Sequence, residues 1–330
     1  MVVQRIYQTE CLTSIDQARL GGAITALVVM ATRLGKTITS ALDVEQYFKG
    51  RRAPVLYLCH KTDILDQAFL EFKKVFGDTR TYGFFHGKKK DFENVDFLFC
   101  SFDTITNWMD LFEPEMFEYI IVDESHHSPA ATYLPIIKHF RPKFMLAITA
   151  TPDRMDAKDI TEIYGKPVYE LPLEKALALG YLTPVDYRML TDEVQLSETI
   201  SAREGQWSIS ALNRQIFIPK RDEEIAQLIA EYTKDVKDLK MIVFCSSVKH
   251  CDRLVSYLPD SLALHSKIPQ KERDLRLEMF RQRMLNTVVT VDCFNEGIDI
   301  PRANVIVFLR STASATIFLQ QLGRGLTKEE

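Results

Sequence analysis

Two series of short apolar segments alternate with amphipathic segments, and this pattern limits the fold of the chain more than any other feature. The first series comprises residues 24–31, 53–60, 96–102, 119–125 and 144–151, and the second comprises residues 239–247, 261–266, 287–292 and 303–310. Continuous apolar runs with polar ends are typical of strands buried on both faces. Helical patterns lie between them, for example at 37–48 and 63–76. Strands that alternate with helices predict parallel sheets with crossover helices, and here they do so twice.

A polar stretch with no strong strand signal, residues 191–224, separates the two series. We interpret it as a connector with one or two short helices. The sequence therefore predicts two α/β domains, residues 1–190 and 225–330, each with a mainly parallel sheet flanked by helices. Ligands of such sheets bind at the carboxyl ends of the strands, so we expect the chemistry in a cleft between the domains.

Composition excludes several classes of protein. A net charge of −4 argues against a protein that coats nucleic acid by bulk charge, but it is compatible with a motor that grips a strand through local contacts. The six cysteines form no CxxC pair, which argues against a zinc site and favours the reduced thiols of the cytoplasm. We find neither a signal-peptide pattern nor an apolar run long enough to cross a bilayer, and we expect no membrane partner.

The tripeptide Gly35-Lys36-Thr37 follows an apolar run and precedes a helical pattern, which is the context of a phosphate-binding loop. Free N–H groups at the start of a helix attract phosphate oxygens. Lys36 would add positive charge at the β- and γ-phosphates, and the Thr37 hydroxyl would bind magnesium. The strict eight-residue pattern fails, because Met30 occupies its first glycine position. The alternative is a glycine turn followed by a surface lysine.

A second candidate site, Asp123-Glu124, stands at the end of an apolar run. Two carboxylates at the carboxyl end of a strand fit a magnesium ligand and a residue that positions water. The alternative is an acidic helix start capped by Ser125. We place the phosphate loop on a neighbouring strand, and that proximity favours the nucleotide site.

With these residues in view, the chain resembles superfamily-two helicases and translocases of the DExH type from Tyr7 to Leu326. The similar segments, in the order of the family's motifs, are RIYQTECL, MATRLGKT, YLCHKTDILDQ, SFDTI, DESH, ITATP, IVFCSSVKHC, TVDCFNEGIDIP and QQLGRGL. The fifth segment does not read DEAD and the last does not read HRxGR, so the DEAD-box RNA helicases fit poorly. The chain is most similar to bacterial and phage proteins of the type III restriction-subunit (ResIII) group.

The resemblance implies two RecA-like domains with an ATP cleft between them, and ATP and Mg²⁺ as cofactors. The residues that it implies at the nucleotide are Arg5, Gln8, Thr32, Arg33, Leu34, Gly35, Lys36, Thr37, Gly297 and Asp299. The catalytic set is Lys36, Asp123, Glu124 and Arg324, with Thr37 and Asp123 as metal ligands. Residues implied to couple ATP to strand binding are His126, Thr149, Thr151 and Gln320.

In this family, Gln8 would recognise adenine, and Gly297 and Asp299 would approach the ribose. Glu124 would orient the attacking water. Arg324 would serve as the arginine finger, which can contribute about 10³–10⁵ in rate once the cleft closes.

The resemblance also implies contacts to a nucleic-acid strand. The residues concerned are His60, Lys61, Ser101, Thr104, Ser246 and Thr290. Hydroxyls, backbone N–H groups and a lysine suit phosphate oxygens, so we expect sequence-independent binding. The resemblance favours DNA, duplex or single-stranded, over RNA as the partner. The basic segment 86–90 is a further candidate, although a solvated charge run explains it equally well. We see no clear aromatic platform for base stacking. We also expect further domains or subunits, and a bacterial or phage-like protein that is located in the cytoplasm.

Two positions depart from the family's pattern. Arg33 stands where the loop has a glycine that takes positive φ, and a non-glycine residue there costs roughly 1 kcal/mol or more. Thr327 stands where the last motif has its second arginine. Two hypotheses follow. The chain is an ATP-dependent helicase or translocase, or it is a catalytically weakened relative that binds nucleotide or nucleic acid as a scaffold in a larger complex.

Overall fold

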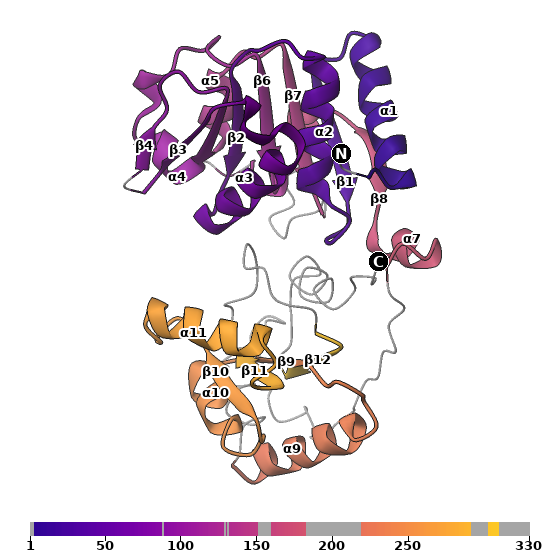
Figure 1. Cartoon of the computed structure of the whole chain (residues 1–330), viewed down its shortest axis with the longest axis vertical. Coiled ribbons are helices and arrows are strands. Elements are labelled where there is room, and N and C mark those ends of the chain that lie inside the picture. Colours follow the sequence, from indigo (N-terminus) through magenta and orange to yellow (C-terminus); the bar gives the residue numbers. More distant parts are fainter. Residues whose placement is uncertain are drawn as a thin grey trace, which may run out of the picture.

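The computed structural model describes residues 3–87, 89–128, 130, 132–150, 160–182, 219–291 and 303–309. Within these residues the strands form an eight-stranded sheet and a separate four-stranded sheet, each flanked by helices (Figure 1). The α/β class and the two series of strands predicted from the apolar runs are confirmed.

The first sheet has the order β4-β3-β5-β2-β6-β7-β1-β8. Its strands are β1 (Thr25–Met30), β2 (Val55–Cys59), β3 (Tyr82–His86), β4 (Lys89–Asp91), β5 (Phe97–Ser101), β6 (Tyr119–Asp123), β7 (Phe144–Thr149) and β8 (Pro167–Leu171). All pairs are parallel except β3 with β4, which is antiparallel.

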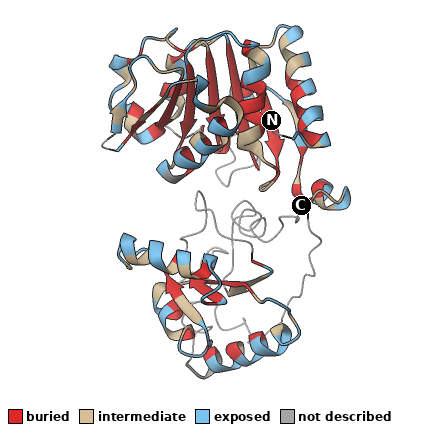
Figure 2. Ribbon diagram, viewed as in Figure 1, coloured by how far each residue is buried: buried red, intermediate tan, exposed pale blue. Residues whose placement is uncertain are grey.

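Helices cover both faces of this sheet. The elements are α1 (Ile6–Leu20), α2 (Lys36–Phe48), α3 (Thr62–Phe76), α4 (Phe102–Thr106), α5 (Leu134–His139), α6 (Thr161–Tyr164) and α7 (Leu173–Ala178), with short 3-10 turns η1 (Gly77–Thr79), η2 (Met109–Leu111) and η3 (Ser125–His127). Helices α1, α2, α3 and α7 bury apolar side chains against one face, and α4, α5 and α6 bury theirs against the other. Figure 2 shows the central strands as almost wholly buried between these two layers.

The second sheet has the order β10-β11-β9-β12 and is parallel throughout. Its elements are α9 (Pro219–Thr233), β9 (Met241–Cys245), α10 (Val248–Leu254), β10 (Ser261–Leu264), α11 (Gln270–Arg281), β11 (Thr287–Thr290) and β12 (Val305–Leu309). Helices α9 and α10 pack on one face, and α11 packs on the other. Helix α9 begins inside the stretch 191–224 that we predicted as a connector, and the exact domain boundaries stay a prediction.

Three strands were not foreseen from the apolar pattern. β4 consists of Lys89-Lys90-Asp91 and forms an edge, where charged residues are common. β8 begins at Pro167 on the other edge, the position in a sheet where proline is tolerated. β3 contains Gly83, where any Cβ would overlap the carbonyl oxygen of Asp91 across the hairpin. Among the described residues, none of the helices is long and apolar enough to cross a bilayer.

Candidate active site

The candidate nucleotide residues meet at the carboxyl edge of the first sheet. Residues 31–35 connect β1 to α2, and Lys36 is the first residue of α2. Our placement of Asp123 on a strand next to β1 was wrong, because β7 lies between β1 and β6. Lys36 nevertheless lies close enough to Asp123 to oppose the rise in its pKa.

The backbone of the phosphate loop bends through two left-handed residues. Gly35 has φ 76° and Arg33 has φ 67°. The position where the family has glycine therefore does take positive φ, and Arg33 adopts it at a cost of roughly 1 kcal/mol. Leu34 between them is fully buried, while Thr32 and Arg33 are half-buried. The loop therefore carries backbone strain at Arg33, its one non-glycine residue with positive φ.

Helix α1 braces this loop through Gln8. The Gln8 Oε1 accepts a hydrogen bond from the backbone N–H of Arg5 at 2.9 Å, and Nε2 donates to the Leu34 carbonyl at 3.5 Å. A side chain at Gly35 would be strained by φ 76°, and its Cβ would lie 2.9 Å from the Gln8 Nε2, which would have to move. Both ends of the Gln8 amide are therefore engaged with protein, and recognition of adenine by Gln8 stays a prediction.

Asp123 ends β6 and is only 5% exposed. Its Oδ1 accepts the backbone N–H of Glu124 at 2.9 Å, and its Oδ2 accepts the phenol of Tyr57. Burial raises the pKa of Asp123, and the charge of Glu124 raises it further, while Lys36 lowers it. A carboxylate held this way has lone pairs left for a cation, but the protein alone does not neutralise it.

Glu124 follows in a left-handed conformation with φ 50°. Its Oε2 is buried and lacks a hydrogen-bond partner among the described residues; the Nδ1 of His126 lies 3.4 Å away. A buried carboxylate oxygen without a donor is costly, and such an atom marks a place for a water molecule or a ligand. The oxygens of Thr37 and Asp123 suit Mg²⁺, and Lys36 with the helix N-terminus suits phosphate, so these residues fit Mg²⁺ and a triphosphate.

Two of the predicted coupling residues, His126 and Thr149, are in contact. His126 is buried, and its Nδ1 lies 3.0 Å from the Oγ1 of Thr149 at the end of β7. The rings of His126 and His127 are 4.2 Å apart, and those of His127 and His60 are 4.3 Å apart, measured between centroids. A continuous series of contacts therefore runs from the end of β6 to the end of β2. Whether it transmits a signal stays a prediction.

The predicted strand-contact residues differ in accessibility. His60 and Lys61 are half-buried at the end of β2, and Thr104 is half-buried on α4. Ser101 is 3% exposed, and its hydroxyl donates to Thr104 Oγ1 at 2.8 Å. In the second sheet, the Oγ of Ser246 is buried without a hydrogen-bond partner among the described residues. The fully buried Thr290 donates to the Leu264 carbonyl at 2.8 Å.

The sequence interpretation missed an aromatic residue beside this edge. Trp108 is 48% exposed, and Lys90 Nζ lies 5.8 Å from the centre of its ring and 4.4 Å from that of Phe85. The backbone N–H of Gly87 donates to Thr104 Oγ1 at 3.3 Å, which fixes the β3–β4 hairpin to α4. Gly87 and Lys90 of the basic segment thus lie beside Thr104 and Trp108, and the tryptophan close after SFDTI was the available signal.

Several predicted residues lie outside the described part of the chain. They are Thr151, Gly297, Asp299, Gln320 and Arg324, together with the departing Thr327. Their roles stay predictions.

Two family models match the chain. The one described as type III restriction enzyme, res subunit, matches residues 2–154, and the one described as helicase conserved C-terminal domain matches residues 220–326. A type I restriction enzyme EcoAI endonuclease subunit from Escherichia coli is 24% identical over 99% of this chain and 44% of its own length. The DNA 3'-5' translocase XPB2 from Sulfurisphaera tokodaii is 25% identical over 65% of this chain and 56% of its own.

A solved fragment assigned as an HsdR subunit of a type I restriction enzyme from Vibrio vulnificus YJ016 has the same fold. The TM-score is 0.77 at 24% identity, covering 100% of this chain and 62% of the fragment. The chain spans about half the length of the curated relatives it matches. Residues 2–154 thus match the res-subunit family and residues 220–326 match the helicase C-terminal family, so the chain is similar over most of its length to superfamily-two helicases of the DExH type.

Proposed function

We propose that the chain is the motor of an ATP-dependent helicase or translocase that acts on DNA. The observation that carries the proposal is the buried Oε2 of Glu124, which lacks a hydrogen-bond partner among the described residues and lies one residue from Asp123. An acceptor left open beside a metal-binding carboxylate is suited to orient the water that attacks the γ-phosphate of ATP. A purely structural carboxylate would have its donors.

In this proposal, Lys36 and the first N–H groups of α2 bind the β- and γ-phosphates. Thr37 and Asp123 hold Mg²⁺, which when bound neutralises charge on the phosphate oxygens. Glu124 Oε2 accepts a hydrogen bond from the attacking water and orients it toward the γ-phosphorus. Arg324 from the second half of the chain completes the site, and Gly297 with Asp299 contacts the ribose.

We place the DNA strand across the carboxyl edge of the first sheet. His60, Lys61 and Thr104 line this edge, and Lys90 with Trp108 extends it. Phosphate oxygens suit the lysines and hydroxyls, and an exposed tryptophan offers a stacking surface of the kind that single-stranded nucleic acid uses. The name of the translocase relative supports DNA over RNA.

Trp108→Ala tests this surface. Loss of one stacked base is worth about 1–3 kcal/mol, so affinity for a single-stranded DNA oligonucleotide should fall roughly tenfold or more in a fluorescence anisotropy titration. Leu111→Ala is the matched control, because Leu111 is also exposed, at 46%, and lies on the same turn. Equal affinities of both variants and the unsubstituted protein would remove Trp108 from the surface.

Steady-state ATP turnover with and without single- and double-stranded DNA and RNA tests the function itself. We expect turnover that DNA stimulates and that Lys36→Ala removes. A protein with no turnover above the Lys36→Ala variant under any of these conditions is not a motor.

The second candidate function is a nucleotide-binding scaffold with weakened hydrolysis. The specific observation in its favour is the strained loop, with Arg33 at φ 67° in a glycine position. In that case ATP binds but DNA does not stimulate turnover. Because the relatives are about twice as long, we propose that further domains or subunits complete the protein, in the cytoplasm of a bacterial or phage-infected cell.

A further inference from the structure

Tyr57 places a hydroxyl group inside the candidate metal site. It is the third residue of β2, is 1% exposed, and lies on the face of the sheet that α2 covers. Its phenol donates a hydrogen bond to Oδ2 of Asp123 and is in hydrogen-bonding contact with the side chain of Thr37. One buried phenol therefore joins the two side chains that we propose as metal ligands.

Packing alone does not account for this hydroxyl. The ring of Tyr57 packs among Phe72 and Phe99, with centroids 5.7 and 5.6 Å away, and a phenylalanine would make the same contacts. A buried hydroxyl is unfavourable unless it finds a partner. Here the partners are Asp123 and Thr37, which the resemblance assigns to Mg²⁺.

The phenol acts as a donor at neutral pH. An ionised carboxylate can only accept hydrogen bonds, so the proton in the contact with Asp123 comes from the phenol. The N–H of Glu124 holds the other oxygen of Asp123 at 2.9 Å. Each carboxylate oxygen thus accepts one protein hydrogen bond and keeps a lone pair, and the carboxylate cannot rotate without losing a bond.

We propose that Tyr57 is a positioning residue for the metal site, fixing Asp123 and Thr37 so that their oxygens face the same ion. The proposal rests on the proposed function. Groups that orient metal ligands by hydrogen bonding typically change metal affinity by 10–100-fold when they are removed. Tyr57 does not touch the substrate, so it acts through the geometry of its two partners.

Tyr57→Phe removes only the hydroxyl. The readout is the binding of a fluorescent, non-hydrolysable ATP analogue at increasing Mn²⁺ concentration, which does not depend on turnover. The Mn²⁺ concentration for half-maximal binding should rise about tenfold, while binding measured with a chelator stays unchanged. An unchanged Mn²⁺ dependence in Tyr57→Phe would overturn the proposal.

The chain supplies a matched control in Tyr119. It begins β6, is fully buried, and donates its phenol to the buried carboxylate of Asp43 at the opposite end of the sheet. Tyr119→Phe deletes the same atom from a similar environment away from the candidate site. If destabilisation alone weakened metal binding, both variants would shift the Mn²⁺ dependence together, and that result would also reject the positioning role.

A crystal structure of the unsubstituted protein with Mg²⁺ and the analogue gives a second readout that does not depend on a variant folding. The Tyr57 hydroxyl should stay within hydrogen-bonding distance of Asp123 while that carboxylate binds the ion. A bound ion with Tyr57 turned away from Asp123 overturns the inference and leaves the proposed function intact. Absence of metal-dependent nucleotide binding in the unsubstituted protein rejects the proposed function and this inference together.

Discussion

The two ends of strand β6 carry nearly the same kinds of residue in opposite environments. Glu118 and Tyr119 stand at its start, and Asp123 and Glu124 stand at its end. At the start, Glu118 accepts hydrogen bonds from Arg51 at 2.6 and 2.9 Å. At the end, Glu124 Oε2 is buried without a hydrogen-bond partner among the described residues. The amino end of β6, where the carboxylate has its hydrogen-bond partners, is called the saturated end below. The carboxyl end, where a carboxylate oxygen lacks one, is called the open end.

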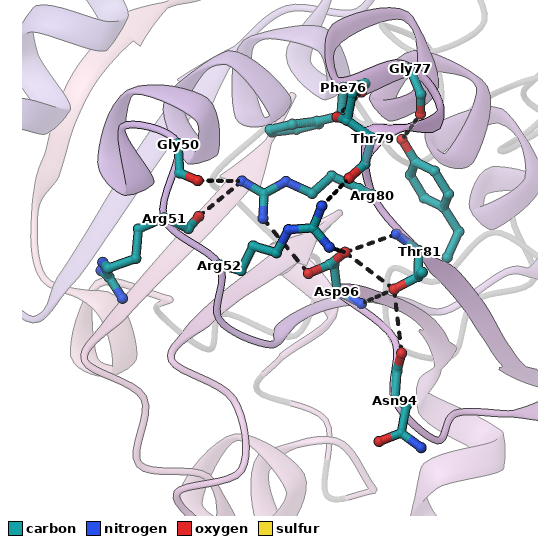
Figure 3. A network of polar contacts seen from close by, with 11 residues as sticks. Gly50, Arg51, Arg52, Phe76, Gly77, Thr79, Arg80, Thr81, Asn94 and Asp96 are labelled. Atoms are coloured by element: carbon teal, nitrogen blue, oxygen red, sulfur yellow. Dashed lines mark hydrogen bonds and ion pairs between the residues drawn. The ribbon is translucent and has the colours of Figure 1, made fainter.

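The saturated end extends along the amino edge of the sheet. Asp96, just before β5, accepts the backbone N–H of Thr81 at 2.9 Å and forms ion pairs with Arg80 at 3.7 Å and Arg52 at 3.6 Å (Figure 3). Arg80 and Arg52 also donate to backbone carbonyls, those of Arg51 at 2.9 Å and Thr79 at 2.6 Å (Figure 3). The charged side chains on this edge are paired with one another or with backbone carbonyls, so nothing here indicates a ligand.

Deeper at the same end, Arg19 from α1 makes two hydrogen bonds to Asp43 of α2, at 2.7 and 2.8 Å, and Tyr119 donates a third. This cluster connects two helices to the start of β6. The carboxyl edge has instead an incompletely paired buried carboxylate, that of Glu124. Unsatisfied polar atoms gather where ligands bind, and paired charges gather where the fold is held together.

Replacing the glutamates at the two ends of β6, Glu118 and Glu124, should give the largest difference in ATP turnover. Glu124→Gln replaces one carboxylate oxygen by an NH2 group and removes the charge that orients the attacking water, so it should lower DNA-stimulated ATP turnover by about 100-fold or more, with the thermal midpoint unchanged. Glu118→Gln should lower the midpoint and leave turnover per folded molecule unchanged, since the Arg51 hydrogen bonds that lower the pKa of Glu118 are lost. A Glu124→Gln protein that retains full turnover would assign the open oxygen to something other than catalysis.

Asp43→Asn tests the saturated end directly. Breaking a buried ion pair leaves the Arg19 guanidinium without its counter-charge, which costs about 3 kcal/mol of unfolding free energy in denaturant titrations. Asp16→Asn is the control, because Asp16 also pairs with Arg19, at 3.4 Å, but is 44% exposed. If both variants lose the same small amount, the buried cluster does not hold α1 to α2.

At the open end, the corresponding exchange removes a carboxylate that lies beside the like charge of Glu124, whereas Asp43 is bonded to an arginine. Burial and the charge of Glu124 raise the pKa of Asp123, so its ionised form destabilises the folded protein, and Asp123→Asn should raise the unfolding free energy at pH 7. This gain is full above the folded-state pKa. It disappears as the pH falls below the unfolded value near 4, where Asp123 is protonated in both states. Unfolding in urea at pH 7 and at pH 4 measures it.

The same variant should lose metal-dependent binding of the ATP analogue. A variant that is more stable but binds no metal indicates that the charge of Asp123 serves to bind a ligand and not to stabilise the fold. A variant less stable than the unsubstituted protein at pH 7 would contradict this account of Asp123.

The carboxylates at the open end of β6 could be predicted from the sequence. The residues that hold them in place could not. The apolar run before Asp123 predicted a buried strand, because a continuous apolar run is typical of a strand buried on both faces. It therefore also predicted that Asp123 and Glu124 lie at the carboxyl end of that strand. Tyr57 could not be found that way. A tyrosine in an apolar run is consistent with simple core packing, and its contact with Asp123 depends on the register that pairs Tyr57 with Ile121 of β6.

The strand order was also beyond the sequence. Apolar runs show that strands exist, but not that β7 lies between β1 and β6, because that order depends on how the crossover helices pack. Trp108 illustrates a third limit. Its 48% exposure and its neighbour Lys90 depend on the β3–β4 hairpin, whose polar edge strand gave no periodic signal.

Replacing Arg33 should give the smallest change in stability and turnover, and it tests whether strain differs in its effect between the two ends of the sheet. Arg33→Gly removes a left-handed non-glycine residue from the open end and should stabilise the fold by roughly 1 kcal/mol. Lys49 is the counterpart at the other end of α2, with φ 47°, so Lys49→Gly should gain a similar amount. The two variants differ in what they do to the loop that binds phosphate.

If strain at Arg33 limits hydrolysis, Arg33→Gly should raise ATP turnover by up to about fivefold, since 1 kcal/mol corresponds to that factor in rate, and Lys49→Gly should leave it unchanged. Loss of ATP binding in Arg33→Gly would instead show that the guanidinium has become a phosphate ligand. Equal turnover in both variants and the unsubstituted protein would mean that the strain affects stability alone. The open end would then be functional in its carboxylates but not in its loop.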